Sequence, residues 1–252
     1  MASLFNEETL ADIDRKFRTV GTRTDGIVLR YVYHPYKSAL AQEFAHHGFV
    51  RRVRILERCI RNVFEMIPPS TSNKVSPAII ADAQINIQAF VANIYGCVDN
   101  LAWVWAHETG LADRIDRRRI GLRSHNTEVR KSLSQETQAY LTGLDQWFAY
   151  VVEYRDALAH RIPLYIPERV RPENIDAYNA LTAQIAEALN TLNAIEYETL
   201  AALQNELLEF QPFITHSIRE TTGQVAFHVQ MIADFLTVEE LGQKMHSICE
   251  GA

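Results

Sequence analysis

Residues 76–107 read SPAIIADAQINIQAFVANIYGCVDNLAWVWAH, and this stretch decides the fold class. It is rich in apolar side chains and contains no Lys or Arg, so most of it must be buried. A membrane span is the competing interpretation, but Asp99 and several Asn and Gln residues interrupt the run, and an acid near mid-membrane costs about 3 kcal/mol. We therefore predict the central helix of a bundle, with Asp99 buried beside a partner and Gly110 as the C-terminal cap.

Apolar periodicity predicts three more long helices around this one. Residues 49–67 carry one apolar face at spacings of three and four. A second helix should begin near Ser134, whose hydroxyl can cap it, and should end before Pro163, which disfavours helical geometry at the preceding residue. A third opens at Pro172, a residue suited to the first turn, and continues to about Leu208. Four such helices predict an all-α bundle.

The remaining segments are expected to complete a single domain over residues 1–252. We place the bundle core at about residues 49–208, with an extension on either side of it. Two apolar, β-branched runs, residues 26–33 and 225–229, are candidates for a minor two-stranded β element. Thr237 stands at capping-box spacing before a Glu, which predicts the start of a C-terminal helix.

Composition narrows the class of protein. The 252 residues are 47% hydrophobic with a formal net charge of −6, which argues against a general nucleic-acid coat. Three cysteines, Cys59, Cys97 and Cys249, are widely spaced and predict buried thiols in a reducing compartment. Residues 1–16 are acidic where an export signal would be basic and apolar. We expect a cytoplasmic protein that does not enter a membrane.

Several local motifs are missing from the sequence. There is no glycine-rich phosphate loop, no HExxH and no GxSxG. Glu43 and His46 have the Glu-x-x-His spacing of di-iron bundles, with His47 adjacent, but such sites need two copies of the motif and only one is present. A solvated helix face is the better interpretation, and we expect neither a metal nor a cofactor.

Arg155 and His160 give the strongest chemical signal, in the sequence YRDALAHR near the end of a predicted helix. Asp156 follows the arginine directly. Histidine titrates close to neutrality and the arginine fork matches phosphate oxygens, so the pair suits phosphodiester cleavage without a metal. The competing interpretation is structural: a histidine bonded to a helix-end carbonyl, and a salt bridge of Arg155 with Glu153 or Asp99.

Basic residues cluster in two places. Residues 114–131 hold seven Lys or Arg and two acids, a local charge of +5, and a mobile loop there could deliver a phosphate backbone to the site; an ordinary exposed connection is the alternative. Arginines also recur at helical spacing along residues 49–67, where a solvated amphipathic face is the commoner meaning. The candidate RNA-binding residues are Arg117, Arg118, Arg119, Arg123 and Arg161, and the helical set is Arg51, Arg54, Arg58 and Arg61.

An apolar helix with an embedded acid, NIYGCVDNL, followed by a helix that ends in Arg155-Asp156-x-x-x-His160, resembles the HEPN superfamily of helical proteins. That family's motif is Arg, four to six residues, then His, commonly with Asn, Asp or His directly after the arginine. The resemblance covers about residues 49–208. Members that cleave RNA are metal-independent and dimeric, with two motifs meeting at the interface, whereas others keep the fold without activity.

The resemblance implies a specific assignment of roles. His160 would move the proton of an RNA 2′-hydroxyl and Arg155 would stabilise the charge on phosphorus, with Asp156 and Asp99 supporting them. Products would be a 2′,3′-cyclic phosphate and a 5′-hydroxyl. The partners expected are RNA, a second copy of the chain, and a cognate inhibitor or partner protein. The alternative is a non-catalytic HEPN-like dimer that binds a protein or a nucleotide-like ligand.

Overall fold

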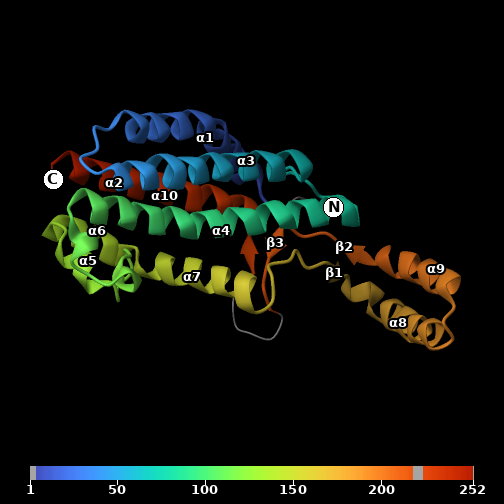
Figure 1. Ribbon diagram of the computed structural model, residues 1–252. Coiled ribbons are helices and arrows are strands. Elements are labelled where there is room, and N and C mark those ends of the chain that lie inside the picture. Colours follow the sequence, from blue (N-terminus) through green and yellow to red (C-terminus); the bar gives the residue numbers. More distant parts are fainter. Residues whose placement is uncertain (1–3, 218–223, 252) are drawn as a thin grey trace.

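The central helix predicted from the sequence is present as α4, Pro77–Glu108 (Figure 1). The Ser76 hydroxyl accepts a hydrogen bond from the Ile79 amide, and Pro77 occupies the first turn. The helix ends before Gly110, whose φ of 68° is the left-handed geometry that glycine adopts without steric cost. Both ends of α4 are therefore set by local sequence.

The computed structural model describes residues 4–217 and 224–251, and these form an all-α bundle with two small antiparallel sheets. α4 packs against α3, Arg51–Met66, and α10, Phe227–Glu250, while α1, Glu7–Tyr33, packs on α3 and α10. α7, Asp145–His160, lies along another side of α4 (Figure 1). The core thus differs from the expected residues 49–208, because α1 and α10 are integral to it.

Three asparagines that interrupt the apolar run of α4 bond side chains of α3. Arg52 donates through Nε to Asn100 Oδ1 and through Nη1 to Asn93 Oδ1, both at 3.0 Å. Asn62 Nδ2 donates to Asn86 Oδ1 at 2.8 Å. These bonds satisfy groups that would otherwise be buried without partners. Within the described ranges, no helix combines the length and hydrophobicity that crossing a bilayer requires.

The expected strand at residues 26–33 is wrong, because this segment lies inside α1 with Ile27, Val28 and Tyr31 buried at helical spacing. Tyr31 donates its hydroxyl to the Gly242 carbonyl of α10 at 2.8 Å, and that helical contact fixes the segment. The second expected strand is confirmed only as β4, Val225–Ala226, which pairs with β3, Phe213–Ile214. α10 then begins at Phe227, so Thr237 is an interior position and not a cap.

The helix predicted from Ser134 onwards is two helices. Ser134 caps α6, Gln135–Gly143, by accepting from the Thr137 amide, but the chain turns at Leu144 before α7 begins. Gly143, an unfavourable residue in a helix interior, lies at this break. The shorter elements are α2, Ala39–Glu43; a π-helix, Phe44–Val50; 3₁₀ turns at Leu111–Asp113, Arg117–Arg119 and Pro172–Asn174; and α5, Thr127–Lys131.

The helix predicted from Pro172 to Leu208 is instead a hairpin that projects beyond the bundle (Figure 1). We call α8, Ile175–Asn190, and α9, Ala194–Asn205, with the turn between them, the arm. Leu192 in that turn has a φ of 53°, and the Asn193 side chain caps α9 by accepting from the Glu196 amide. Strands β1, Arg169–Val170, and β2, Leu208–Glu209, pair antiparallel and close the base of the arm.

Candidate functional site

Arg155 lies at the edge between α7 and α4, one position beyond the buried Tyr154. Its guanidinium carbon is 4.0 Å from the centroid of the Tyr95 ring, and its Nη1 is 3.0 Å from Asp156 Oδ1. The Nε atom is buried and makes no hydrogen bond within the part of the chain that the structure describes. The aromatic face supports the cation, and one donor of the guanidinium remains unused.

A second arginine uses the same aromatic ring. Arg123, from the loop that follows α4, places its guanidinium carbon 4.7 Å from the Tyr95 centroid and its Nη2 3.3 Å from Asp99 Oδ1. Tyr95 and Asp99 are four residues apart and lie on one face of α4. We call Tyr95, Asp99, Arg123 and Arg155 the Tyr95 cluster. The sequence suggested a bond between Asp99 and Arg155, whereas the partner found for Asp99 is Arg123.

Asp99 is less buried than expected, because its side chain is 36% exposed. Burial still raises the pKa of this carboxyl above its ordinary value, while Arg123, Arg155 and Arg52 act in the opposite direction. The expected partner is therefore present, and the expected burial is only partial. The cluster holds two guanidinium groups beside one carboxylate at a half-exposed position, an arrangement suited to receiving an anion.

His160 is the last residue of α7, as predicted, and it is exposed. Its imidazole makes no hydrogen bond or ion pair with any residue in the described ranges. Five positions on an α-helix correspond to a rotation of roughly 140°, so His160 and Arg155 emerge on different faces of α7. Arg161, which follows, donates through Nη2 to the Glu153 carbonyl at 3.3 Å. One copy of the chain does not bring the two motif residues together.

The basic loop is ordered largely by its own charges. Arg119 lies 2.5 Å from Glu128, and the buried Arg130 lies 2.5 Å from Asp145 and donates to the Leu122 carbonyl. With the ion pair of Arg123, three of the seven basic residues already have acidic partners. Among the described residues, exposed Arg118 forms no ion pair. The charge available to a ligand is thus smaller than the sequence count of +5.

Arg117 differs from its neighbours because it stacks on an aromatic side chain. Its guanidinium carbon lies 5.3 Å from the Trp103 ring, which is itself stacked with Phe44 and His107 at centroid separations of 5.2–5.5 Å. These rings are half-buried. Neither this group nor Tyr95 was predicted from the sequence. The available signals were the four-residue spacings of Trp103 and His107, and of Tyr95 and Asp99.

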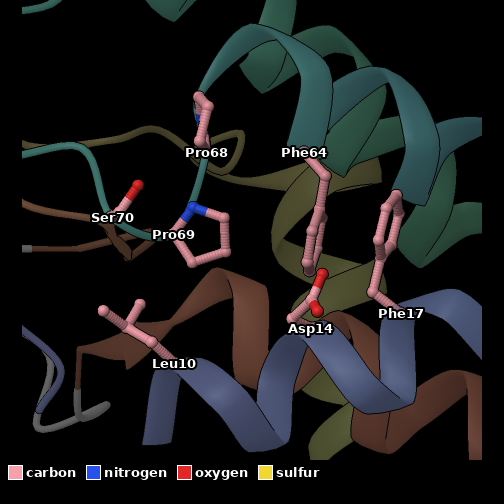
Figure 2. Close-up of a pocket in the computed structure, with 7 residues that line it drawn as sticks. All are labelled: Leu10, Asp14, Phe17, Phe64, Pro68, Pro69 and Ser70. Atoms are coloured by element: carbon pink, nitrogen blue, oxygen red, sulfur yellow. The ribbon is translucent and has the colours of Figure 1, made fainter. Parts of the chain in front are cut away.

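Two surface pockets lie away from the Tyr95 cluster. An apolar hollow of about 340 Å³ lies between α1 and the end of α3, where Phe17 and Phe64 stack at 4.5 Å (Figure 2). A polar hollow of about 410 Å³ is lined in part by Glu43, His46 and His47. Over the described ranges, no group of three or more His, Cys, Asp or Glu side chains is arranged to hold a metal ion.

Comparison with known proteins gives no relative. No protein-family model, no characterised protein and no solved structure matches the chain. The class of protein is therefore defined by the fold alone, an all-α bundle with a projecting arm.

Proposed function

We propose that the chain is a metal-independent endoribonuclease of HEPN type, acting at the Tyr95 cluster and the exposed end of α7. The observation that carries the proposal is the setting of Arg155. Its guanidinium lies on the face of the Tyr95 ring, and its Nε has no hydrogen-bond partner in the described structure. The same end of α7 exposes the imidazole of His160. The sequence motif Arg155-Asp156-x-x-x-His160 supplies the remaining support.

The chemistry follows from these groups. The RNA 2′-hydroxyl attacks the adjacent phosphorus, so the phosphorus–O2′ bond forms and the phosphorus–O5′ bond breaks. One imidazole removes the 2′-hydroxyl proton and a protonated one donates to the leaving O5′. Arg155 stabilises the added negative charge on the phosphoryl oxygens. Asp156, which holds Arg155 in the free protein, gives way to the phosphate, and Arg117, Arg118 and Arg123 contact the strand.

The proposal requires a homodimer. A single His160 supplies one of the two proton transfers, and it lies on a different face of α7 from Arg155. A two-fold axis near the end of α7 provides the second imidazole without any further sequence. RNA as the substrate agrees with the cytoplasmic location that composition predicts for the protein. A cognate inhibitor would cover the same end of α7.

A second function is favoured by one observation, the existing ion pair of Arg155 with Asp156 at 3.0 Å. A guanidinium already neutralised by its neighbour, with no bond to His160, suits a structural or binding role. On this alternative the chain is a non-catalytic HEPN-like dimer that binds a partner protein or a nucleotide-like ligand, and both side chains serve the contact.

Cleavage assays in EDTA test the proposal. Arg155→Ala and His160→Ala should each lower cleavage of a panel of single-stranded and structured RNAs by about 10²–10⁴-fold, with little change in melting temperature. Arg18→Ala and His47→Ala are matched controls, since both are exposed residues on other elements, α1 and the π-helix, and they should keep wild-type cleavage. A wild-type protein that leaves the whole panel uncut would overturn the nuclease assignment.

The products provide an independent check on the reaction. An RNA with a single 2′-deoxy substitution at the cleavage site should remain uncut there, because the attacking hydroxyl is missing. Cleaved fragments should end in a 2′,3′-cyclic phosphate. Fragments with a 3′-hydroxyl would indicate a different chemistry, and retained cleavage in both alanine variants would assign the activity to other residues.

A further inference from the structure

The tip of the arm exposes large apolar side chains. Leu192 is 90% exposed and Ile195 is 80% exposed, and Leu189 and Tyr197 complete the surface around a hollow of about 210 Å³. Leu192 also has a φ of 53°, a backbone region that is sterically unfavourable for an L-residue with a bulky side chain. A strained leucine left in water at the end of a projecting element is typical of a contact surface.

The charge around this tip has a single sign. Residues 172–217 contain no Lys or Arg. Glu187, Glu196 and Glu198 are exposed, and none forms an ion pair in the described structure. The tip is therefore apolar at its centre with carboxylates at its rim, and it should bind an apolar patch that is surrounded by cations.

The outer face of α3 has that complementary composition. Ile55 is 41% exposed, and Arg51 and Arg58 flank it at four and three positions along the helix. Arg54 is adjacent, and all three arginines are exposed without an ion pair among the residues described. In the same chain, α3 begins at one end of the bundle and the arm projects beyond the other end (Figure 1).

We propose that the tip of the arm docks on the outer face of α3 in a second copy of the chain. Leu192 and Ile195 cover Ile55, while the tip glutamates face Arg51, Arg54 and Arg58. The contact is reciprocal, because a one-way contact between a tip and a separate surface would continue into open filaments, whereas two reciprocal contacts close a dimer.

Charge argues against the simpler pairing of two arms with each other. Arm-to-arm packing would bury the same apolar side chains but would gather carboxylates from both copies with no cation to balance them. Like charges held together at an interface oppose association. One two-fold axis serves both proposals, so a single dimer carries the reciprocal arm contacts and brings the two α7 ends together. The arm contacts supply the stability of this dimer, and neither their apolar centre nor their ion pairs include residues of the Tyr95 cluster.

Reciprocal charge reversal tests the interface by light scattering. The wild type should have twice the 28.8 kDa chain mass at micromolar concentration. Glu187→Lys with Glu198→Lys should give a monomer, and so should Arg51→Glu with Arg58→Glu. All four changes in one chain should restore the dimer. Asp25→Lys with Asp82→Lys shifts the net charge as much as the first pair but at exposed positions elsewhere, and it should leave the dimer unchanged.

Leu192→Asn tests the apolar part without reversing charge. Asparagine tolerates the left-handed turn, so the arm should fold while the dimer dissociation constant rises by about tenfold or more. A wild-type monomer would overturn the inference. A dimer that survives both charge-reversed pairs would also overturn it. If that dimer is instead lost in the Arg155 or His160 variants, the dimer forms through the end of α7, as the nuclease proposal assumes, and not through the arm.

Discussion

Asp234 is a carboxylic acid in the core, on α10, where it is 3% exposed. Trp147 Nε1 and Gln230 Nε2 both donate to its Oδ1 at 2.8 Å. Burial raises the pKa of Asp234 to about 7, and the two hydrogen bonds oppose this shift. Since the folded-state pKa lies above the unfolded value, the contribution of Asp234 to stability is complete below about pH 4 and is lost as the pH rises through about 7.

We predict that Asp234→Asn removes this dependence. Asparagine keeps an acceptor for both donors and carries no charge, so the variant should match the wild type within about 1 kcal/mol near pH 4 and be more stable by roughly 3–4 kcal/mol near pH 8.5. Urea unfolding at both pH values measures the difference. Asp82→Asn, at an exposed position of α4, should show no such divergence, and equal curves for Asp234→Asn and wild type would contradict the assignment.

The motif residues could be predicted from the sequence, but their surroundings could not. Arg155 and His160 are local in the chain, and Pro163 indicated correctly that His160 ends its helix. Which arginine reaches Asp99 depends on the path of the loop after α4, and periodicity carries no information about that path. The sharing of the Tyr95 ring by Arg123 and Arg155 is likewise a tertiary event.

At Gly242, α10 packs so closely on Phe49 and Ile27 that a side chain would not fit. A Cβ there would lie 2.8 Å from Phe49 Cζ and 3.3 Å from Ile27 Cδ1, and Phe49 is fully buried. Gly242→Ala should therefore destabilise the protein by about 1–3 kcal/mol through overpacking. Gly26→Ala is the matched control inside α1, where a Cβ meets nothing within 4 Å.

The control variant should behave in the opposite way. Removing the conformational freedom of Gly26 in a helix interior should raise the free energy of unfolding by about 0.5–1 kcal/mol. Thermal melts of the two variants measure both effects. If the Gly242 and Gly26 variants shift in the same direction, helix propensity and not close packing governs α10.

Long helices with strong periodicity were predicted well, and their interruptions were not. α3 follows from apolar spacing, and α4 from its apolar run and the glycine that ends it. The breaks at Leu144 and at residues 191–193 leave the apolar pattern almost unchanged, because both helices on either side of a break still bury one face. The strand predicted at residues 26–33 was wrong because a β-branched run fits a buried helix face as well as it fits a strand.

The arm is joined to the bundle through a narrow base. Val170 of β1 pairs with Leu208 of β2, and α8 and α9 pack chiefly on each other. Replacing residues 171–207 by Asn-Gly should join β1 and β2 as a two-residue hairpin. The ion pair that ties this segment to α3–α4, Lys74 with Glu206, lies at the surface and stabilises the fold little. We therefore expect a melting temperature within about 4 °C of the wild type.

This replacement also separates stability from assembly. Circular dichroism should show a loss of helix confined to the arm, and light scattering should show a monomer. A drop in melting temperature well beyond the expected range would instead assign the arm a role in supporting the core.

The packing of α1 on α10 sets the order in which the protein can be completed during synthesis. Arg23 pairs with Glu239, and Tyr31 with Gly242, across more than two hundred residues of sequence. At about 5–20 residues per second, roughly 10–40 s pass between the emergence of Tyr33 and that of Phe227. Throughout that interval the apolar face of α1 has no partner in α10. The nascent chain must therefore wait, with part of its core open to solvent or to a chaperone, until its most distant helix arrives.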